Sequence, residues 1–219
     1  MSGATQDAAH HMDGIYKYQR HIYNPTRKYY LLGRDLLLNE LEPDDGSTVL
    51  EVGCGTGRNL IHAARRWPNA RFVGIDISLA MLETAWTSIA RSGLSDRIAV
   101  YQADATAFDL SVLCGEAHVG RVFISYTLSM IPPWRQVLEQ ALEAVGPSGR
   151  LHILDFGQQE AWQPWFKALL FAWLRQFSVY PRAELEPELT KLVSAKGAEL
   201  EFRRLYRGYA DYAVITKPE

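Results

Sequence analysis

The residues most suited to chemistry form a glycine-rich stretch, VLEVGCGTGRNL, which begins at Val49. Its alternate glycines, Gly53, Gly55 and Gly57, follow a β-branched apolar run and precede a helical pattern. A strand that turns into a helix there can bring its backbone close to a ligand. The spacing is GxGxG, and Arg58 occupies the position at which the nicotinamide fingerprint GxGxxG needs its third glycine. The stretch therefore indicates a ligand other than a nicotinamide dinucleotide.

Two carboxylates follow the next two expected strands. Asp76 ends the run ARFVGIDI, close to the offset of about 20 residues at which a carboxylate meets ribose hydroxyls. Asp104 lies in QADA, at the end of the run RIAVYQADA. Because ligands of open parallel sheets bind at the carboxyl ends of the strands, both side chains are candidates for the same site.

A second unusual stretch, YKYQRHIYNPTRKYYLLGRD, precedes the first expected strand. Its twenty residues, 16–35, include five tyrosines and six cationic or potentially cationic side chains. This composition fits either a well-solvated helix or a segment that closes over an anionic, methyl-rich ligand. We interpret residues 1–45 as an N-terminal tail with a helical lid, and residues 46–219 as one Rossmann-like domain.

The elements that must position these residues alternate between strand and helix patterns. Strands are expected near 47–53, 70–77, 97–105, 120–128 and 150–156, and helices near 56–67, 78–93 and 134–145, with Ser78 as a helix cap and Gly146-Pro147 as a stop. The tail 199–217 resembles an antiparallel pair that turns near Arg207-Gly208. This alternation predicts an α/β fold with a doubly wound, mostly parallel sheet and an antiparallel C-terminal strand.

Composition limits the possible functions. A chain of 219 residues with 47% hydrophobic and 22% charged residues suits one globular domain. The net charge of -2 argues against general nucleic-acid binding. Cys54 and Cys114 are far apart and have no metal-ligand spacing, so we expect neither zinc nor a disulfide. The first residues lack the apolar region of a secretory signal, and we expect a cytoplasmic protein.

The glycine stretch resembles motif I of the class I S-adenosylmethionine-dependent methyltransferases, in which Glu51 would precede the glycines. The resemblance implies S-adenosylmethionine as cofactor. It implies a carboxylate on the ribose (Asp76) and another beside the adenine (Asp104). The full set of expected cofactor-binding residues is Tyr30, Arg34, Glu51, Gly53, Gly55, Gly57, Asp76, Ile77, Met81, Asp104, Ala105 and Ser125.

A narrower resemblance rests on the tyrosine-rich N-terminal stretch, on SYTLSMIPPW (125–134) and on an aromatic insertion that ends in FSVYPR (177–182). These resemble the bacterial diacylglyceryl-homoserine N-methyltransferases, which make the betaine lipid diacylglyceryl-trimethylhomoserine. For such a substrate, guanidinium and ammonium groups suit its carboxylate, and aromatic faces suit its methylated ammonium. We expect substrate contacts from Arg20, Arg27, Lys28 and Thr127, and catalytic contacts from Tyr16, Tyr23 and Tyr126.

The insertion near 160–180 predicts an aromatic amphipathic helix. Its apolar side chains follow helical spacing from Trp162 to Phe177, whereas Phe171 falls outside that stripe with Lys167 and Arg175. Such a helix either covers the sheet or lies in a membrane interface, and with a lipid substrate we favour membrane contact. Phosphatidylethanolamine or a quinone precursor remains possible as the acceptor, and so does a cofactor-binding module without catalysis.

Overall fold

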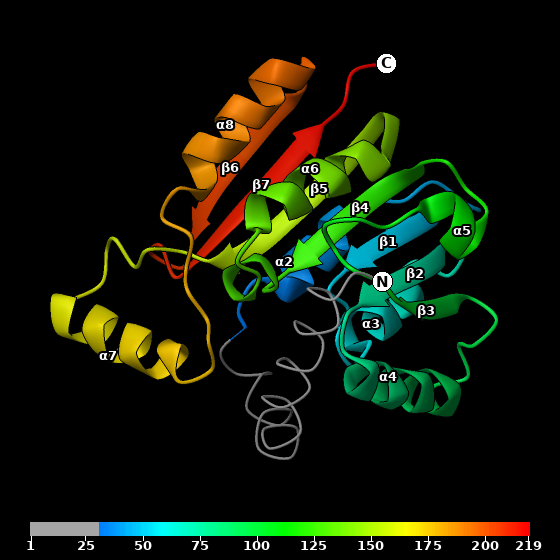
Figure 1. Cartoon of the computed structure of the whole chain (residues 1–219), viewed down its shortest axis with the longest axis horizontal. Coiled ribbons are helices and arrows are strands. Elements are labelled where there is room, and N and C mark those ends of the chain that lie inside the picture. Colours follow the sequence, from blue (N-terminus) through cyan, green and yellow to red (C-terminus); the bar gives the residue numbers. More distant parts are fainter. Residues whose placement is uncertain (1–30) are drawn as a thin grey trace.

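The computed structural model describes residues 31–219, which form a seven-stranded sheet flanked by helices (Figure 1). The strand order is β3-β2-β1-β4-β5-β7-β6. The strands are β1 (Thr48–Val52), β2 (Arg71–Asp76), β3 (Ile98–Gln102), β4 (Val119–Ser125), β5 (Val145–Phe156), β6 (Glu199–Leu205) and β7 (Ala210–Thr216). Strands β1 to β5 are parallel, and β7 runs antiparallel to β5 and β6. The expected Rossmann-like fold is confirmed.

Helices on both faces of the sheet enclose two apolar cores. The helices are α2 (Arg34–Glu40), α3 (Arg58–Arg66), α4 (Leu79–Arg91), α5 (Leu110–Cys114), α6 (Trp134–Ala144), α7 (Pro164–Arg175) and α8 (Leu185–Lys196), with a 3-10 turn η1 (Leu128–Met130). Helices α2, α3 and α4 supply the core on one face. Helices α5, α6 and α8 supply the core on the other. All of β1 is buried, as expected for a strand inside a parallel sheet covered on both faces.

Most element boundaries follow the predicted signals. Ser78 caps α4 and accepts a hydrogen bond from the Met81 backbone N–H, and the C-terminal strands turn at residues 206–209 as expected. The predicted helix stop at Gly146-Pro147 agrees with the structure to within two residues, but the predicted start of the next strand was wrong. Helix α6 ends at Ala144, and β5 begins at once, because Val145 pairs with Val119 of β4. The fifth strand is therefore longer than predicted.

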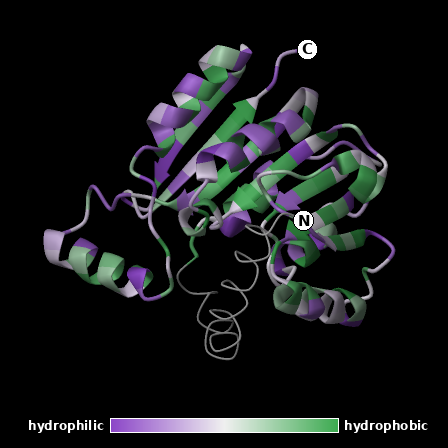
Figure 2. Cartoon of the chain, in the orientation of Figure 1, coloured by the Kyte–Doolittle hydropathy of each residue, from purple (hydrophilic) through white to green (hydrophobic). Residues whose placement is uncertain are grey.

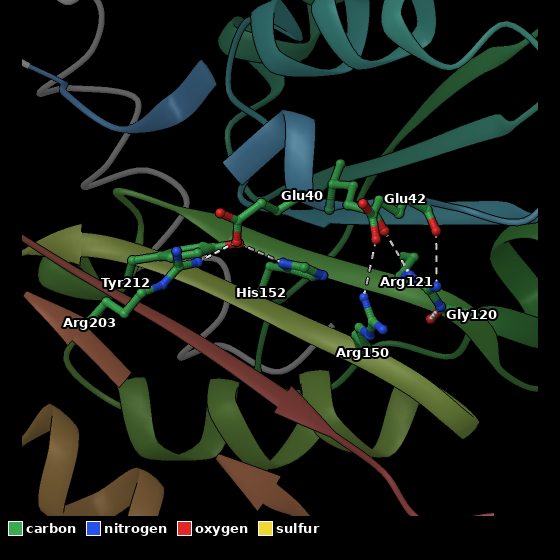
Figure 3. Close-up of polar contacts among 9 residues, drawn as sticks. Glu40, Glu42, Gly120, Arg121, Arg150, His152, Arg203 and Tyr212 are labelled. Carbon is green, nitrogen blue, oxygen red and sulfur yellow. Dashed lines mark hydrogen bonds and ion pairs between the residues drawn. The ribbon is translucent and has the colours of Figure 1, made fainter. Parts of the chain in front are cut away.

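Helix α2 belongs to the body of the domain. Leu37 and Leu41 are almost fully buried in the core beside α3. Beyond the helix, the Arg121 guanidinium donates to the carbonyls of Leu41 (2.7 Å) and Glu42 (2.9 Å), as Figure 3 shows. Residues 31–45 of the predicted lid therefore pack as part of the sheet structure, whereas residues 1–30 lie outside the described part of the chain.

A polar cluster on β5, β6 and β7 holds the end of α2 from below (Figure 3). Arg203 pairs with Glu40, and the Tyr212 hydroxyl lies 2.9 Å from His152 Nδ1. Burial, with help from nearby arginines, lowers the pKa of His152 to about 3, so the imidazole is neutral at physiological pH. A neutral ring beside Tyr212 avoids a buried, unpaired charge under the helix.

Helix α7 lies at the periphery of the domain (Figure 1). One side contacts the core through Leu170, Trp173, Phe177 and the buried Leu174. Phe171 also packs against this core, so its predicted place outside the packed stripe was wrong. Within residues 31–219, every helix is too short or too polar to cross a bilayer.

Candidate functional site

A cavity of about 360 Å³ opens at the carboxyl ends of β1, β2, β3 and β4. Nearly all of the described residues that the sequence assigned to a ligand lie around it. They are Arg34, Glu51, Gly53, Gly55, Asp76, Ile77, Met81, Asp104, Ala105, Ser125, Tyr126 and Thr127. The parallel register of β1 with β2 and β4 explains this convergence, because the ends of these strands meet at one edge.

The glycine stretch forms the turn between β1 and α3. Gly53 has φ of 76°, and a Cβ atom there would lie 2.3 Å from the Thr127 side chain. A larger residue would therefore be both strained and in collision with the end of β4. The Asp76 carboxylate holds the same turn, since it accepts hydrogen bonds from the backbone N–H groups of Gly55 (2.8 Å) and Ser78 (2.9 Å). Asp76 thus shapes the loop as well as facing the cavity.

Gly57 does not line the cavity. It precedes α3 with φ of 72°, and an added Cβ would lie 3.2 Å from the Cβ of Ala85 in α4. This glycine permits the left-handed turn and the close approach of α3 to α4. Gly57 therefore affects the site through the backbone conformation that it allows.

Glu51 is a buried carboxyl group of the cavity with a strongly raised pKa. Its side chain is 1% exposed, Oε1 accepts a hydrogen bond from Asn59 (2.8 Å), and Oε2 has no partner among the described residues. Burial raises the pKa of Glu51 to about 8, although Asn59 and the charge of Arg34 oppose the shift. A cationic ligand group would pair with this carboxylate and stabilise its ionised form.

A second buried polar atom on the neighbouring strand also lacks a described partner. This is Ser125 Oγ, at the end of β4. Buried polar groups are usually hydrogen-bonded, so Ser125 and Glu51 together indicate that a polar ligand completes this part of the cavity.

Asp104, just beyond the end of β3, contributes a further polar group to the cavity lining. Asp104 Oδ1 accepts hydrogen bonds from the Thr106 N–H (2.9 Å) and hydroxyl (2.7 Å). Ile77 and Met81 approach from the β2–α4 junction and supply apolar lining. An apolar slot beside a carboxylate suits a flat, partly polar ring system.

Tyr126 lies at the cavity but in a packed position. Its side chain is 5% exposed, and the ring meets Phe156 edge-on at 4.6 Å. Its hydroxyl donates to the carbonyl of Leu32 at 2.5 Å. Burial raises the pKa of Tyr126 well above its usual value, so the hydroxyl stays protonated. These contacts give Tyr126 a structural role that joins β4 to the segment before α2, and they do not support the predicted catalytic role.

Six of the predicted site residues lie outside the described part of the chain: Tyr16, Arg20, Tyr23, Arg27, Lys28 and Tyr30. The structure also adds lining residues that the motifs did not identify, namely Cys54, Thr56, Asn59, Thr106, Met130 and residues 131–133. Asn59 could have been found from its place in the first turn of the helix that follows the glycine turn. The contribution of residues 130–133 depends on tertiary contacts and has no local signal.

Comparisons with known proteins agree with this geometry. Residues 49–149 match the methyltransferase domain family. Trans-aconitate 2-methyltransferase of Azoarcus sp. (strain BH72) is 32% identical over 120 residues, which are 55% of this chain and 43% of that protein. The chain thus spans less than half the length of this relative.

Solved structures share the fold over a larger part of the chain. A SAM-dependent methyltransferase from Aquifex aeolicus superposes with a TM-score of 0.64 at 20% identity, covering 91% of this chain and 96% of that one. An O-methyltransferase family protein from Burkholderia thailandensis gives 0.67 at 18%, covering 95% and 59%. At sequence identities this low, the similarity to these solved structures shows that the fold is shared.

The chain has the Rossmann-like fold of these solved structures, and its residues 49–149 resemble the methyltransferase domain family. Its cofactor is S-adenosylmethionine. The cavity fits this group: Glu51 would hold its amino group, Asp76 its ribose and Asp104 the edge of its adenine. When bound, the cofactor supplies an activated methyl group.

Proposed function

We propose that this chain methylates the amine of diacylglyceryl-homoserine in successive steps that yield the betaine lipid diacylglyceryl-trimethylhomoserine. The observation that carries the proposal is the outward face of α7. Trp165 is 69% exposed and Leu169 is 64% exposed, one helical turn apart. Large apolar side chains grouped on an exposed face are typical of interaction surfaces. Hydrophobic residues along this helix are visible in Figure 2.

The chemistry of the cavity is compatible with an amine acceptor. The described lining contains neither histidine nor lysine that could act as a base. A neutral amine already carries the lone pair that attacks the methyl group; a proton can leave to solvent after the first and second transfers, and the third leaves a permanent cation. The chain would contribute alignment and exclusion of water. Methylation at a ring carbon would need a positioned base, so the quinone alternative is less favoured.

The membrane and its location complete the proposal. Helix α7, within the predicted segment Trp162–Phe177, would lie in the headgroup region of the inner face of the cell membrane, with Trp165 and Leu169 inserted. The protein would be cytoplasmic and peripherally associated, with a lipid as its substrate and no nucleic-acid partner. Arg175, exposed in the last turn of α7, would remain near the headgroups.

Sedimentation with vesicles of diacylglyceryl-homoserine and anionic phospholipid tests the membrane part. The double change Trp165→Ser with Leu169→Ser should weaken vesicle binding about tenfold or more, since each exposed side chain gains roughly 1.5–3 kcal/mol on burial. The same variant should keep its melting temperature. Val112→Ser is the matched control, because Val112 is 80% exposed on α5. Equal binding by the double variant and wild type would contradict the proposal.

A further inference from the structure

The loop that follows β4 forms one wall of the cofactor cavity. We call residues 127–133 the wall loop; it contains η1, and Thr127, Met130 and Ile131 line the cavity from it. Thr127 contacts the glycine turn directly, since its hydroxyl lies 3.3 Å from the Gly53 carbonyl. The position of the wall loop therefore affects the width of the cavity at the glycine turn.

Three carbonyl groups of the wall loop accept hydrogen bonds from one short segment that follows α7. The Arg182 guanidinium donates from Nε to the Leu128 carbonyl (3.0 Å) and from its terminal nitrogen to the Ile131 carbonyl (2.9 Å). Between them, the Tyr180 backbone N–H donates to the Ser129 carbonyl (2.8 Å). The planar guanidinium of Arg182 can hold the Leu128 and Ile131 carbonyls in a fixed relation, which an ammonium group cannot reproduce.

The hydrogen bonds from Arg182 to the wall loop are partly buried, so their loss would be costly. Burial lowers the pKa of Arg182, and the nearby charge of Asp155 opposes that shift. The Asp155 carboxylate is 1% exposed and accepts the Ser129 N–H at 3.1 Å. Ser129 is thus held from both sides, by Asp155 of β5 and by the segment after α7.

The same segment is continuous with the end of α7. The Val179 N–H donates to the Leu174 carbonyl (3.1 Å), and the Ser178 N–H donates to the Arg175 carbonyl (3.1 Å). Leu174 and Val179 are both buried in the core. A change in the orientation of the last turn of α7 would therefore move the donors that hold the wall loop, because few residues separate them.

We propose that Arg182 is a positioning residue for methyl transfer, which fixes the wall loop and couples the cavity to α7. The coupling rests on the proposed function, because it gives membrane contact by α7 a direct route to the active site. The role of Arg182 in holding the wall loop does not depend on which acceptor is used.

Hydrogen exchange of the full chain with S-adenosylhomocysteine bound tests the positioning role without any acceptor. Arg182→Met should speed exchange of the wall-loop amides 128–131 about tenfold or more, since two bonds from a charged donor are lost. Arg182→Lys should give an intermediate value. Arg135→Met is the matched control. Like Arg182, Arg135 lies over the Trp134 ring, but within residues 31–219 its ion pairs go to Glu184 and Glu188 rather than to the wall loop.

Kinetics then separate positioning from a merely structural role. Arg182→Met should lower kcat about tenfold or more, Arg182→Lys should restore part of it, and KM for the cofactor should change less than kcat. Unchanged wall-loop exchange in Arg182→Met, or equal acceleration throughout the domain in both Arg182 variants, would overturn the proposal.

Adding anionic phospholipid vesicles tests the coupling. Vesicles should slow exchange in α7 and in the wall loop of wild type, and only in α7 of Arg182→Met. Slower exchange in α7 with an unchanged wall loop in wild type would refute the coupling and leave the proposed function standing. No effect of vesicles on α7 would instead contradict the membrane part of the proposed function, while the Arg182 variants would still report on the wall loop.

Discussion

The raised pKa of Glu51 predicts that cofactor binding depends on pH. At pH 6 the ligand-free protein holds Glu51 protonated, because its pKa is about 8. A ligand ammonium favours the ionised carboxylate, so binding should release a proton. Affinity for S-adenosylhomocysteine should therefore rise with pH, for as long as the ligand amino group, with a pKa near 7.7–8.0, stays protonated.

The size of the effect follows from one-proton linkage. If the complex returns Glu51 to its ordinary pKa of 4.5, affinity increases about tenfold per pH unit, which sets an upper limit of roughly a hundredfold between pH 5.5 and 7.5. Since the carboxylate stays buried in the complex, we expect a smaller rise, of about tenfold over that range.

Calorimetric titration in buffers of different ionisation enthalpy measures both the affinity and the proton released. Glu51→Gln keeps the shape of the side chain and its contact with Asn59, and should give a flat profile between pH 5.5 and 7.5. Adenosine is a second control, because it lacks the amino group and should bind without this dependence. A flat profile for folded wild-type protein, or the same slope in Glu51→Gln, would refute the pairing.

Three further predictions concern the same fold. Asp76→Asn should weaken S-adenosylhomocysteine binding about tenfold or more in calorimetry, because charge-assisted hydrogen bonds contribute roughly 1.5–3 kcal/mol each; unchanged affinity would contradict the ribose assignment. Gly53→Ala should lower the melting temperature and cofactor affinity together, since the new methyl collides with Thr127; normal values of both would refute the close packing of the glycine turn against Thr127. His152→Gln should flatten the loss of folding stability on acidification below pH 6.5, because the unfolded imidazole takes up a proton that the folded one resists down to about pH 3. Urea unfolding across pH 4–6.5 measures this, and an unchanged slope would count against a neutral, buried His152.

The cofactor side of the cavity could be predicted from the sequence because its signals are local. The glycine turn, Asp76 and Asp104 each lie at or just beyond the end of a strand, and parallel strands must bring those ends together. The burial that perturbs Glu51 also follows from its place within a fully buried strand.

The packing of residues 126–133, which form another side of the cavity, could not be predicted, because it depends on contacts between residues far apart in the sequence. Tyr126 is an example: its hydroxyl bonds to Leu32, 94 positions away, so the residue packs where a ligand contact was expected. Arg182 meets Leu128 across 54 positions. Helical periodicity likewise identified α7 but not its rotation, because apolar residues surround much of the helix, and only the fold determines that Phe171 turns inward.

Mass spectrometry of lipids after incubation with methyl-deuterated S-adenosylmethionine tests the central proposal most directly. The protein would be mixed with vesicles of diacylglyceryl-homoserine, with parallel reactions on phosphatidylethanolamine vesicles and on trans-aconitate. We predict deuterated methyl groups on the homoserine nitrogen, with mono- and dimethylated lipid appearing before the trimethylated betaine. Unlabelled diacylglyceryl-homoserine, alongside methylation of either other acceptor, would contradict the proposed function.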